Sequence, residues 1–174
     1  MGTGGVFLRK VRATVAERPT GFHWVEYGKL AVSGYPASKR QLEWVSKRGV
    51  NSVLTLTEDP LPSAWGNELG LSLEHVPMKD HQPPSLESLE KVALYIQSQV
   101  EGGRVVLVHC LAGQGRTMCA IAAYLIRSKG MTAQEAIDSL RAVRPGAVER
   151  SQEKAVRDYE ARFRLRTESP EQTR

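Results

Sequence analysis

The sequence contains little cysteine and no long apolar run, and each absence excludes a class of protein. Two cysteines among 174 residues are too few for a disulfide framework, so we expect free thiols and a reducing compartment. No apolar run approaches the roughly 20 residues that cross a bilayer. The first residues lack the apolar core of a secretory signal. We therefore expect a cytoplasmic protein that does not associate with membranes.

Positive charge exceeds negative charge, with 24 Lys and Arg residues against 19 Asp and Glu residues. Such an excess can attract phosphorylated ligands, but we assign most of it to the two ends of the chain. The residues concerned are Lys10, Arg12 and Arg18 near the beginning and Arg162, Arg164, Arg166 and Arg174 near the end. No basic cluster is interleaved with aromatic residues, so we expect no nucleic-acid binding.

The segment from His109 to Thr117 combines a cysteine, two glycines and an arginine between a predicted strand and a predicted helix. A strand, a short glycine-containing loop and a helix start direct backbone N–H groups and the positive helix end at one point. The same environment favours the thiolate form of Cys110. Arg116, six positions later, can bind two phosphate oxygens with its planar guanidinium. The spacing predicts a phosphate-binding loop with a nucleophile at its centre.

Strands and helices alternate along the chain, which predicts an α/β fold. The expected strands span residues 29–33, 51–57, 71–77 and 105–108, with a Pro- and Gly-rich loop after the second. The expected helices run from Ser38 to Gly49, from Ser85 through Val100, from Met118 to Gly130, from Thr132 through Val143 and from Ser151 to Phe163. We expect a central, mainly parallel, twisted sheet of four to five strands with helices on both faces. The phosphate site should lie at the carboxyl end of the sheet.

The pattern His-Cys-x5-Arg-Thr resembles the signature of the protein tyrosine phosphatase superfamily. From about Phe22 to Arg162 the chain is similar to the small, atypical dual-specificity branch of that superfamily. An upstream aspartate and the downstream run Arg144-Pro145-Gly146 support the resemblance. It implies the phosphatase fold and hydrolysis of phosphomonoesters through a phosphocysteine intermediate, with no cofactor and no metal.

The resemblance also implies roles for the residues of the loop. Cys110 would be the nucleophile, and His109 would order the loop and help to keep the thiolate charged. Arg116 and the preceding backbone amides would hold the phosphoryl oxygens. Those amides belong to Leu111, Ala112, Gly113, Gln114 and Gly115. Thr117 would donate a hydroxyl to the sulfur, although an ordinary position in the first turn of a helix explains it equally well.

Asp80 lies thirty positions before Cys110, where the family carries the proton donor for the leaving group. It stands in a loop between a predicted strand and a predicted helix, and we assign it as the general acid. Glu58, Asp59 and Glu68 compete for this role. Glu58 is the reserve candidate because it closes a strand.

Two further positions leave alternatives open. In the family, a glutamine near Gln152 positions the attacking water, and Glu149 is close enough in sequence to share that work. Capping at the start of the last helix explains both residues as well. Cys119 is either a resolving thiol for oxidised Cys110 or, as we favour, a small buried apolar residue. Met118 departs from the glycine that the family usually has here, so packing behind the loop must differ.

We divide the chain into a flexible basic segment at 1–20, a catalytic domain at 21–165 and a disordered tail at 166–174. The predicted function is hydrolysis of phosphotyrosine, and more weakly of phosphoserine and phosphothreonine, in proteins or peptides, by a monomer. One alternative is a phosphoinositide phosphatase, but such relatives carry lysines in the loop, where this chain has Leu111 and Gln114. Another is a phosphate-binding module without turnover, but such relatives have lost the cysteine or the arginine.

Overall fold

The computed structural model describes residues 17–168. Their contacts divide them into two compact units, and the chain passes from one unit to the other three times. The first unit consists of residues 17–77 and Gln99–Gly113, and the second of Met78–Ser98 and residues 114–168. Most of the predicted basic segment at 1–20, and the tail from residue 169 onward, lie outside the described residues.

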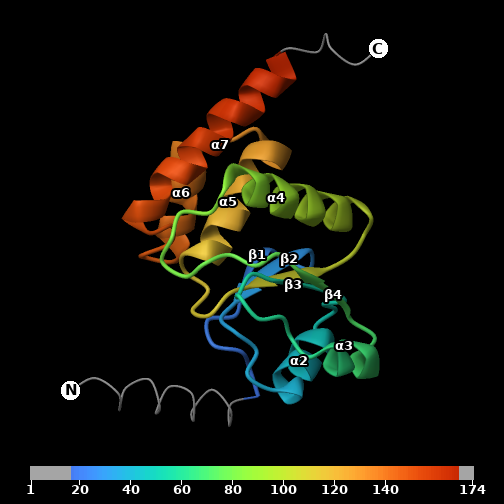
Figure 1. Ribbon diagram of the computed structural model, residues 1–174. Coiled ribbons are helices and arrows are strands. Elements are labelled where there is room, and N and C mark those ends of the chain that lie inside the picture. The colour runs from blue at the N-terminus through green and yellow to red at the C-terminus, as the bar shows by residue number, and fades with distance from the viewer. Residues whose placement is uncertain (1–16, 169–174) are drawn as a thin grey trace, which may run out of the picture. The chain divides into compact units, whose positions relative to one another are not determined.

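The first unit contains a five-stranded sheet (Figure 1). Its strands are β1 (His23–Glu26), β2 (Leu30–Ser33), β3 (Ser52–Thr55), β4 (Ser72–His75) and β5 (Val106–His109), in the spatial order β1-β2-β5-β3-β4. β1 pairs antiparallel with β2, and the other neighbours are parallel. The predicted mainly parallel sheet is thus confirmed. β1 was not expected, because this short edge strand is only partly buried and shows no apolar run.

The strand register aligns the carboxyl ends of four strands. Ser33 of β2 and Thr55 of β3 both pair with His109 of β5, and His75 of β4 pairs with Thr55. β5 occupies the middle of the sheet, and its strand residues are buried. The register therefore places Cys110 directly beyond the end of the central strand.

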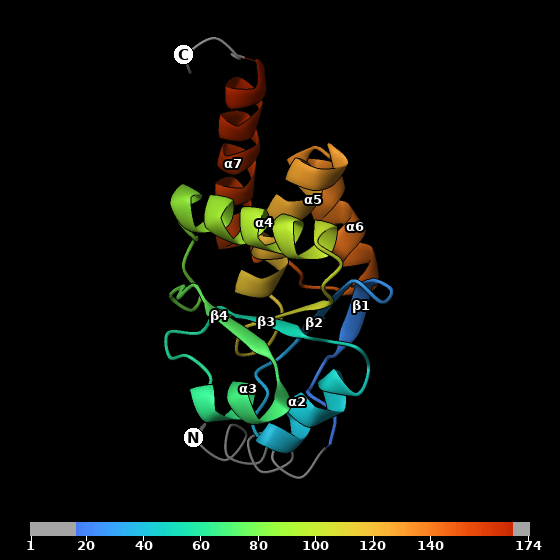
Figure 2. The same cartoon turned by 90° about the vertical axis from the view of Figure 1, so that its right-hand side faces the viewer.

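Helices α2 (Lys39–Ser46) and α3 (Ser63–Leu69) lie on the same side of the sheet, as Figures 1 and 2 show. The side chain of Ser38 caps α2, as its sequence predicts. α3 occupies a segment that we expected to be loop, because Gly66 weakens its helical pattern. A Cβ atom at Gly66 would lie 2.7 Å from Cγ of Leu73 on β4, so glycine lets the helix approach the sheet.

The apolar core of this unit consists of residues from the strands, from α2 and from the connecting loops. Its buried members are Phe22, Ala31, Leu42, Val45, Val50, Val53, Leu61, Leu71 and Leu107. These side chains fix the sheet and so the position at which β5 ends.

The second unit is helical. It holds most of α4 (Leu86–Glu101), together with α5 (Arg116–Lys129), α6 (Ala133–Val143) and α7 (Arg150–Glu168). α5, α6 and α7 pack against one another (Figure 1), and the side chains of Arg127 on α5 and Tyr159 on α7 both contact Glu90 on α4. The predicted capping box of α6 and the glycine C-cap of α5 at Gly130 are present.

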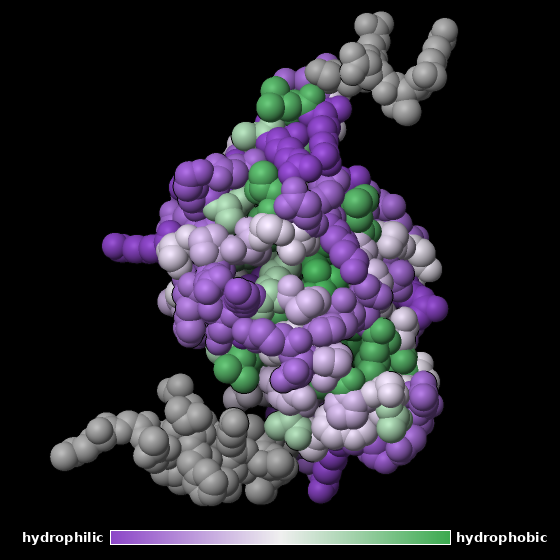
Figure 3. Space-filling view, in the orientation of Figure 1, coloured by the Kyte–Doolittle hydropathy of each residue, from purple (hydrophilic) through white to green (hydrophobic). Residues whose placement is uncertain are grey.

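α7 is longer than its sequence suggested. We expected it to end near Phe163, but it continues to Glu168, which places residues 166–168 of the predicted tail in the helix. An ion pair four residues apart, Arg164 with Glu160, supports the extra turns. The sequence signal was weak because few apolar residues remain in this part, and Figure 3 shows the end of α7 as mostly hydrophilic with isolated hydrophobic side chains.

Candidate active site

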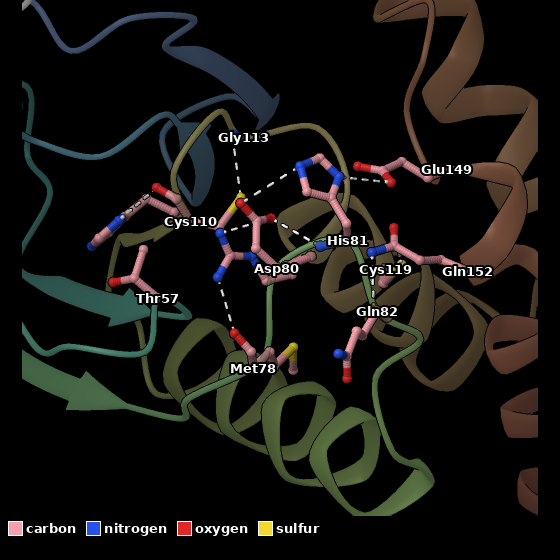
Figure 4. A network of polar contacts seen from close by, with 12 residues as sticks. Thr57, Met78, Asp80, His81, Gln82, Cys110, Gly113, Cys119, Glu149 and Gln152 are labelled. Atoms are coloured by element: carbon pink, nitrogen blue, oxygen red, sulfur yellow. Dashed lines mark hydrogen bonds and ion pairs between the residues drawn. The ribbon is translucent and has the colours of Figure 1, made fainter. Parts of the chain in front are cut away.

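The first half of the predicted phosphate loop belongs to the first unit. Cys110 follows β5 and is only 3% exposed. The backbone N–H of Gly113 donates a hydrogen bond to Cys110 Sγ at 3.2 Å (Figure 4). Gly113 has a φ of +71°, a backbone conformation that glycine adopts without strain. This hydrogen bond fixes the sulfur against the backbone of the loop.

His109 links the loop to the neighbouring strand. Its Nε2 lies 2.9 Å from Oγ1 of Thr55, and its Nδ1 lies 3.3 Å from the carbonyl oxygen of Cys110. A carbonyl only accepts, so Nδ1 carries the hydrogen and a neutral ring accepts the hydroxyl hydrogen of Thr55 at Nε2. The ring of Tyr35 packs against the ring of His109 in an edge-to-face arrangement, with the two centroids 5.7 Å apart. This buried position suits a residue that orders the loop.

Arg116 begins α5 in the second unit and is 2% exposed. Its Nη1 donates to the carbonyl oxygen of Met78 at 2.9 Å, and its Nη2 lies 2.9 Å from Oδ1 of Asp80. Asp80 Oδ1 also accepts the backbone N–H of His81 at 3.1 Å. The structure thus brings together the predicted phosphate-binding arginine and the predicted acid. A buried guanidinium needs such partners, since leaving its charge uncompensated would be strongly destabilising.

The three acids that compete for the role of Asp80 belong to other segments of the chain. Glu58 and Asp59 are exposed after β3, in the first unit. Glu68 lies on α3 and forms an ion pair with Lys39 of α2. The carboxylate that contacts Arg116 within the second unit is that of Asp80.

Thr117 lies in the first turn of α5 and is fully buried. Its Oγ1 has no hydrogen-bond partner among the described residues. Buried hydroxyls are nearly always paired in folded proteins, so this one is available for a functional contact.

Gln152 is fully buried at the start of α7. Its Nε2 donates to the carbonyl oxygen of Gln82 at 3.2 Å, and its Oε1 accepts from the thiol of Cys119 at 3.5 Å (Figure 4). A Cβ atom at Gly115 would lie 2.9 Å from Gln152 Oε1. The amide therefore packs directly against the second half of the phosphate loop.

Glu149 contacts two segments with its two carboxylate oxygens. A Cβ atom at Gly115 would lie 2.9 Å from its Oε1, and its Oε2 lies 3.2 Å from Nδ1 of His81 (Figure 4). The other ring nitrogen of His81 lies 3.8 Å from Asp80 Oδ2. The hydrogen bond to Glu149, with the charges of Asp80 and Glu149, raises the pKa of His81 above its ordinary value. His81 had no predicted role, because nothing in the neighbouring sequence identifies its partner Glu149.

Arg141 holds the connection between α6 and α7. Its guanidinium donates to the carbonyl oxygens of Ala147 at 3.0 Å and Val148 at 2.8 Å, and to Glu153 Oε1 at 2.6 Å. The N–H of Val148 in turn donates to the carbonyl oxygen of Gln114 at 3.2 Å. Arg141 was also missed, since an arginine on an amphipathic helix carries no sequence signal for such contacts.

Residues 19–156 match the family model described as PTP-SAK, Swiss Army Knife protein, DSP-PTPase phosphatase domain. The chain is 35% identical over 111 residues to the tyrosine-protein phosphatase cdcA of Emericella nidulans, covering 63% of this chain and 19% of that protein. It is 28% identical over 142 residues to the phosphatidylglycerophosphate phosphatase PTPMT2 of Arabidopsis thaliana, covering 78% of this chain and 62% of that protein.

The crystal structure of Tk-PTP in the active form is similar at a TM-score of 0.74 and 32% identity, over 81% of this chain and 97% of that chain. Among the curated relatives, the chain spans about a fifth of the length of cdcA and about three fifths of the length of PTPMT2.

Proposed function

The chain belongs to the PTP-SAK family of DSP-PTPase phosphatase domains, and on this premise we propose that it hydrolyses phosphotyrosine, and more weakly phosphoserine and phosphothreonine, in proteins. The resemblance to the dual-specificity phosphatases is confirmed by that match, and phosphatase chemistry follows from it. The choice of a protein substrate is the proposal. The contact of the buried Arg116 with Asp80 supports phosphate-ester hydrolysis, because it pairs an anion-binding group with a potential proton donor. The neutral Leu111 and Gln114 in the loop support a protein substrate over a ligand with several phosphates.

In the proposed mechanism, the thiolate of Cys110 attacks phosphorus and the bond from phosphorus to the substrate oxygen breaks. Asp80 gives its proton to that oxygen. Arg116 and the loop amides hold the three phosphoryl oxygens, on which charge must be stabilised. A bound phosphate would take over the guanidinium of Arg116, which frees the Asp80 carboxyl to face the leaving oxygen.

In the second step, water held by Gln152 attacks the phosphocysteine and passes a proton to Asp80. The sulfur–phosphorus bond breaks, phosphate leaves and Cys110 returns as a thiolate. Thr117, whose hydroxyl is buried, would donate to the departing sulfur, and His109 would keep the loop in place.

Hydrolysis of p-nitrophenyl phosphate tests the role of Cys110. We expect Cys110→Ser to lose activity and still bind phosphate, because the amides and Arg116 remain. Cys119→Ala, a change of the other cysteine, is the matched control and should stay active. Activity in Cys110→Ser would overturn the covalent mechanism.

A lipid phosphate is the second candidate substrate, because PTPMT2 is named a phosphatidylglycerophosphate phosphatase. The neutral Leu111 and Gln114 in the loop argue against a ligand with several phosphates. Initial rates on one peptide carrying phosphotyrosine, phosphoserine or phosphothreonine, beside phosphatidylglycerophosphate and a soluble phosphoinositide, decide between them. Faster turnover of either lipid would overturn the protein substrate and leave the cysteine chemistry intact.

Among residues 17–168, no helix has the length and apolar character to cross a bilayer. The cytoplasmic location, the monomeric state and the absence of nucleic-acid partners stay predictions.

A further inference from the structure

Two loops of the second unit carry unusual backbone conformations. Among the described residues, the non-glycine positions with positive φ are His81 and Val148, each at 54°. His81 directly follows Asp80, and Val148 directly precedes Glu149. Such conformations persist only where surrounding contacts enforce them, and they often mark functional positions.

The side chains next to these two positions join the loops. The His81 ring lies between two carboxylates, with Nδ1 3.2 Å from Glu149 Oε2 and Nε2 3.8 Å from Asp80 Oδ2. The backbone N–H of His81 also donates to Asp80 Oδ1 at 3.1 Å. One residue thus contacts both oxygens of the proposed acid.

Glu149 is itself fixed from the other side. Its Oε1 packs against Gly115, and the N–H of Val148 donates to the carbonyl oxygen of Gln114. Arg141 holds the carbonyl of Val148. His81 therefore contacts a carboxylate whose position is set by residues 114 and 115 of the phosphate loop.

We propose that His81 is a positioning residue, which couples Asp80 to the phosphate loop through Glu149 so that the Asp80 carboxyl is directed at the leaving oxygen. This inference rests on the proposed function of Asp80 as general acid. A neighbouring link, from Gln152 to the carbonyl of Gln82, also holds this segment. That link acts on the backbone, whereas the His81 link includes the acid's own carboxylate.

The charged groups that face the His81 ring are Asp80 from its own loop, Glu149 from the connection before α7 and Arg116 from α5. The imidazole has a ring nitrogen directed at each carboxylate and so contacts both, while the shorter side chain of asparagine does not offer this pair of nitrogens. The ring is largely exposed, so solvent weakens each contact and the effect on the rate should be moderate.

The test compares two substrates that differ in their need for an acid. Phenyl phosphate has a poor leaving group, and p-nitrophenyl phosphate has an activated one. Asparagine tolerates the left-handed backbone, so His81→Asn removes the imidazole without adding strain. Glu149→Gln breaks the same link from the other side, and His23→Asn, a change of an exposed histidine on β1, is the matched control.

We expect Asp80→Asn to lower kcat on phenyl phosphate by about 10²-fold or more, with a much smaller loss on p-nitrophenyl phosphate. His81→Asn and Glu149→Gln should each lower kcat on phenyl phosphate by about fivefold. On p-nitrophenyl phosphate their effect should be smaller, and His23→Asn should match the wild type. In the Asp80→Asn background, His81→Asn should add nothing, because the group that it positions is gone.

If Asp80→Asn slows both substrates equally, the acid assignment and the mechanism proposed above fail. If Asp80→Asn discriminates between the substrates but His81→Asn does not, the mechanism stands and the positioning role is wrong. Equal losses on both substrates in His81→Asn would also overturn it, because they indicate a structural role. Should His81→Asn fold poorly by circular dichroism, the discrimination by Glu149→Gln decides.

Discussion

Cys110 and Arg116 lie six positions apart in one loop, yet they are held by different means. Cys110 is placed by backbone structure, namely the register of β5 and the amide of Gly113. Arg116 is placed by polar contacts from residues distant in sequence, such as Met78 and Asp80. The nucleophile therefore depends on the sheet, whereas the arginine depends on side chains and carbonyls that single substitutions can remove.

Replacement of Arg116 by lysine should have the largest effect, because it removes the polar contacts that hold the arginine. The point charge of lysine cannot keep the contact with Met78 and bind two phosphate oxygens at once, so we expect kcat/KM to fall by about 10³-fold. Steady-state kinetics on p-nitrophenyl phosphate measures this. Arg104→Lys, a change of an exposed arginine, is the control and should match the wild type. A loss below tenfold would show that the guanidinium geometry is unimportant.

The contact between Gly115 and the start of α7 can be tested by a single methyl group. In Gly115→Ala, the new Cβ would lie 2.9 Å from oxygens of Gln152 and Glu149, so both side chains must move. Small misplacements at an active site cost up to about 10²-fold in rate, and we expect a loss of this order in kcat. Gly34→Ala is the comparison variant in the first unit, because it also adds a methyl group in close contact with the loop: its Cβ would lie 3.0 Å from the carbonyl oxygen of Leu111. Unchanged kcat in Gly115→Ala would mean that the Gln152 position is not critical.

Removal of the Arg141 side chain tests the support of the connection between α6 and α7. Arg141→Ala leaves the carbonyls of Ala147 and Val148 and the carboxylate of Glu153 without their donor. We expect the free energy of unfolding to fall by about 2 kcal/mol, measured by urea denaturation. Arg141→Lys should recover only part, because lysine cannot reach the three oxygens together. An exposed arginine, Arg150, provides the control substitution to alanine.

The smallest effect concerns pH and His81. Because its pKa is raised in the folded protein, the protonated ring stabilises the fold below about 6.5, its ordinary value. This stabilisation is lost as pH rises through the raised pKa. Thermal unfolding at about pH 6 and about pH 9 should show a Tm difference between wild type and His81→Asn at the lower pH only. An equal difference at both values would contradict the charged contact.

The residues placed by local structure were predictable, and those placed by distant partners were not. The order of strand, glycine loop and helix around Cys110 is written in consecutive residues, so sequence analysis found the loop and both flanking elements. The contacts of His81 and Arg141 depend on residues that only the fold brings close. α3 was missed for the opposite reason, since Gly66 weakens the helix locally and is explained only by Leu73 on another strand. Roles such as those of Gln152 and Thr117 stay predictions.

The two hydrogen bonds of Gln152 determine what its amide can still offer. A glutamine amide has two lone pairs on oxygen and two N–H hydrogens. The carbonyl of Gln82 can only accept, which fixes Nε2 on that side, and the thiol of Cys119 occupies one lone pair of Oε1. One acceptor and one donor are left over, in fixed directions, and a water molecule needs both to be held in a single orientation. Glutamate at this position would keep the acceptor and lose the donor, so in the proposed second step a carboxylate of nearly the same shape would leave the attacking water free to turn.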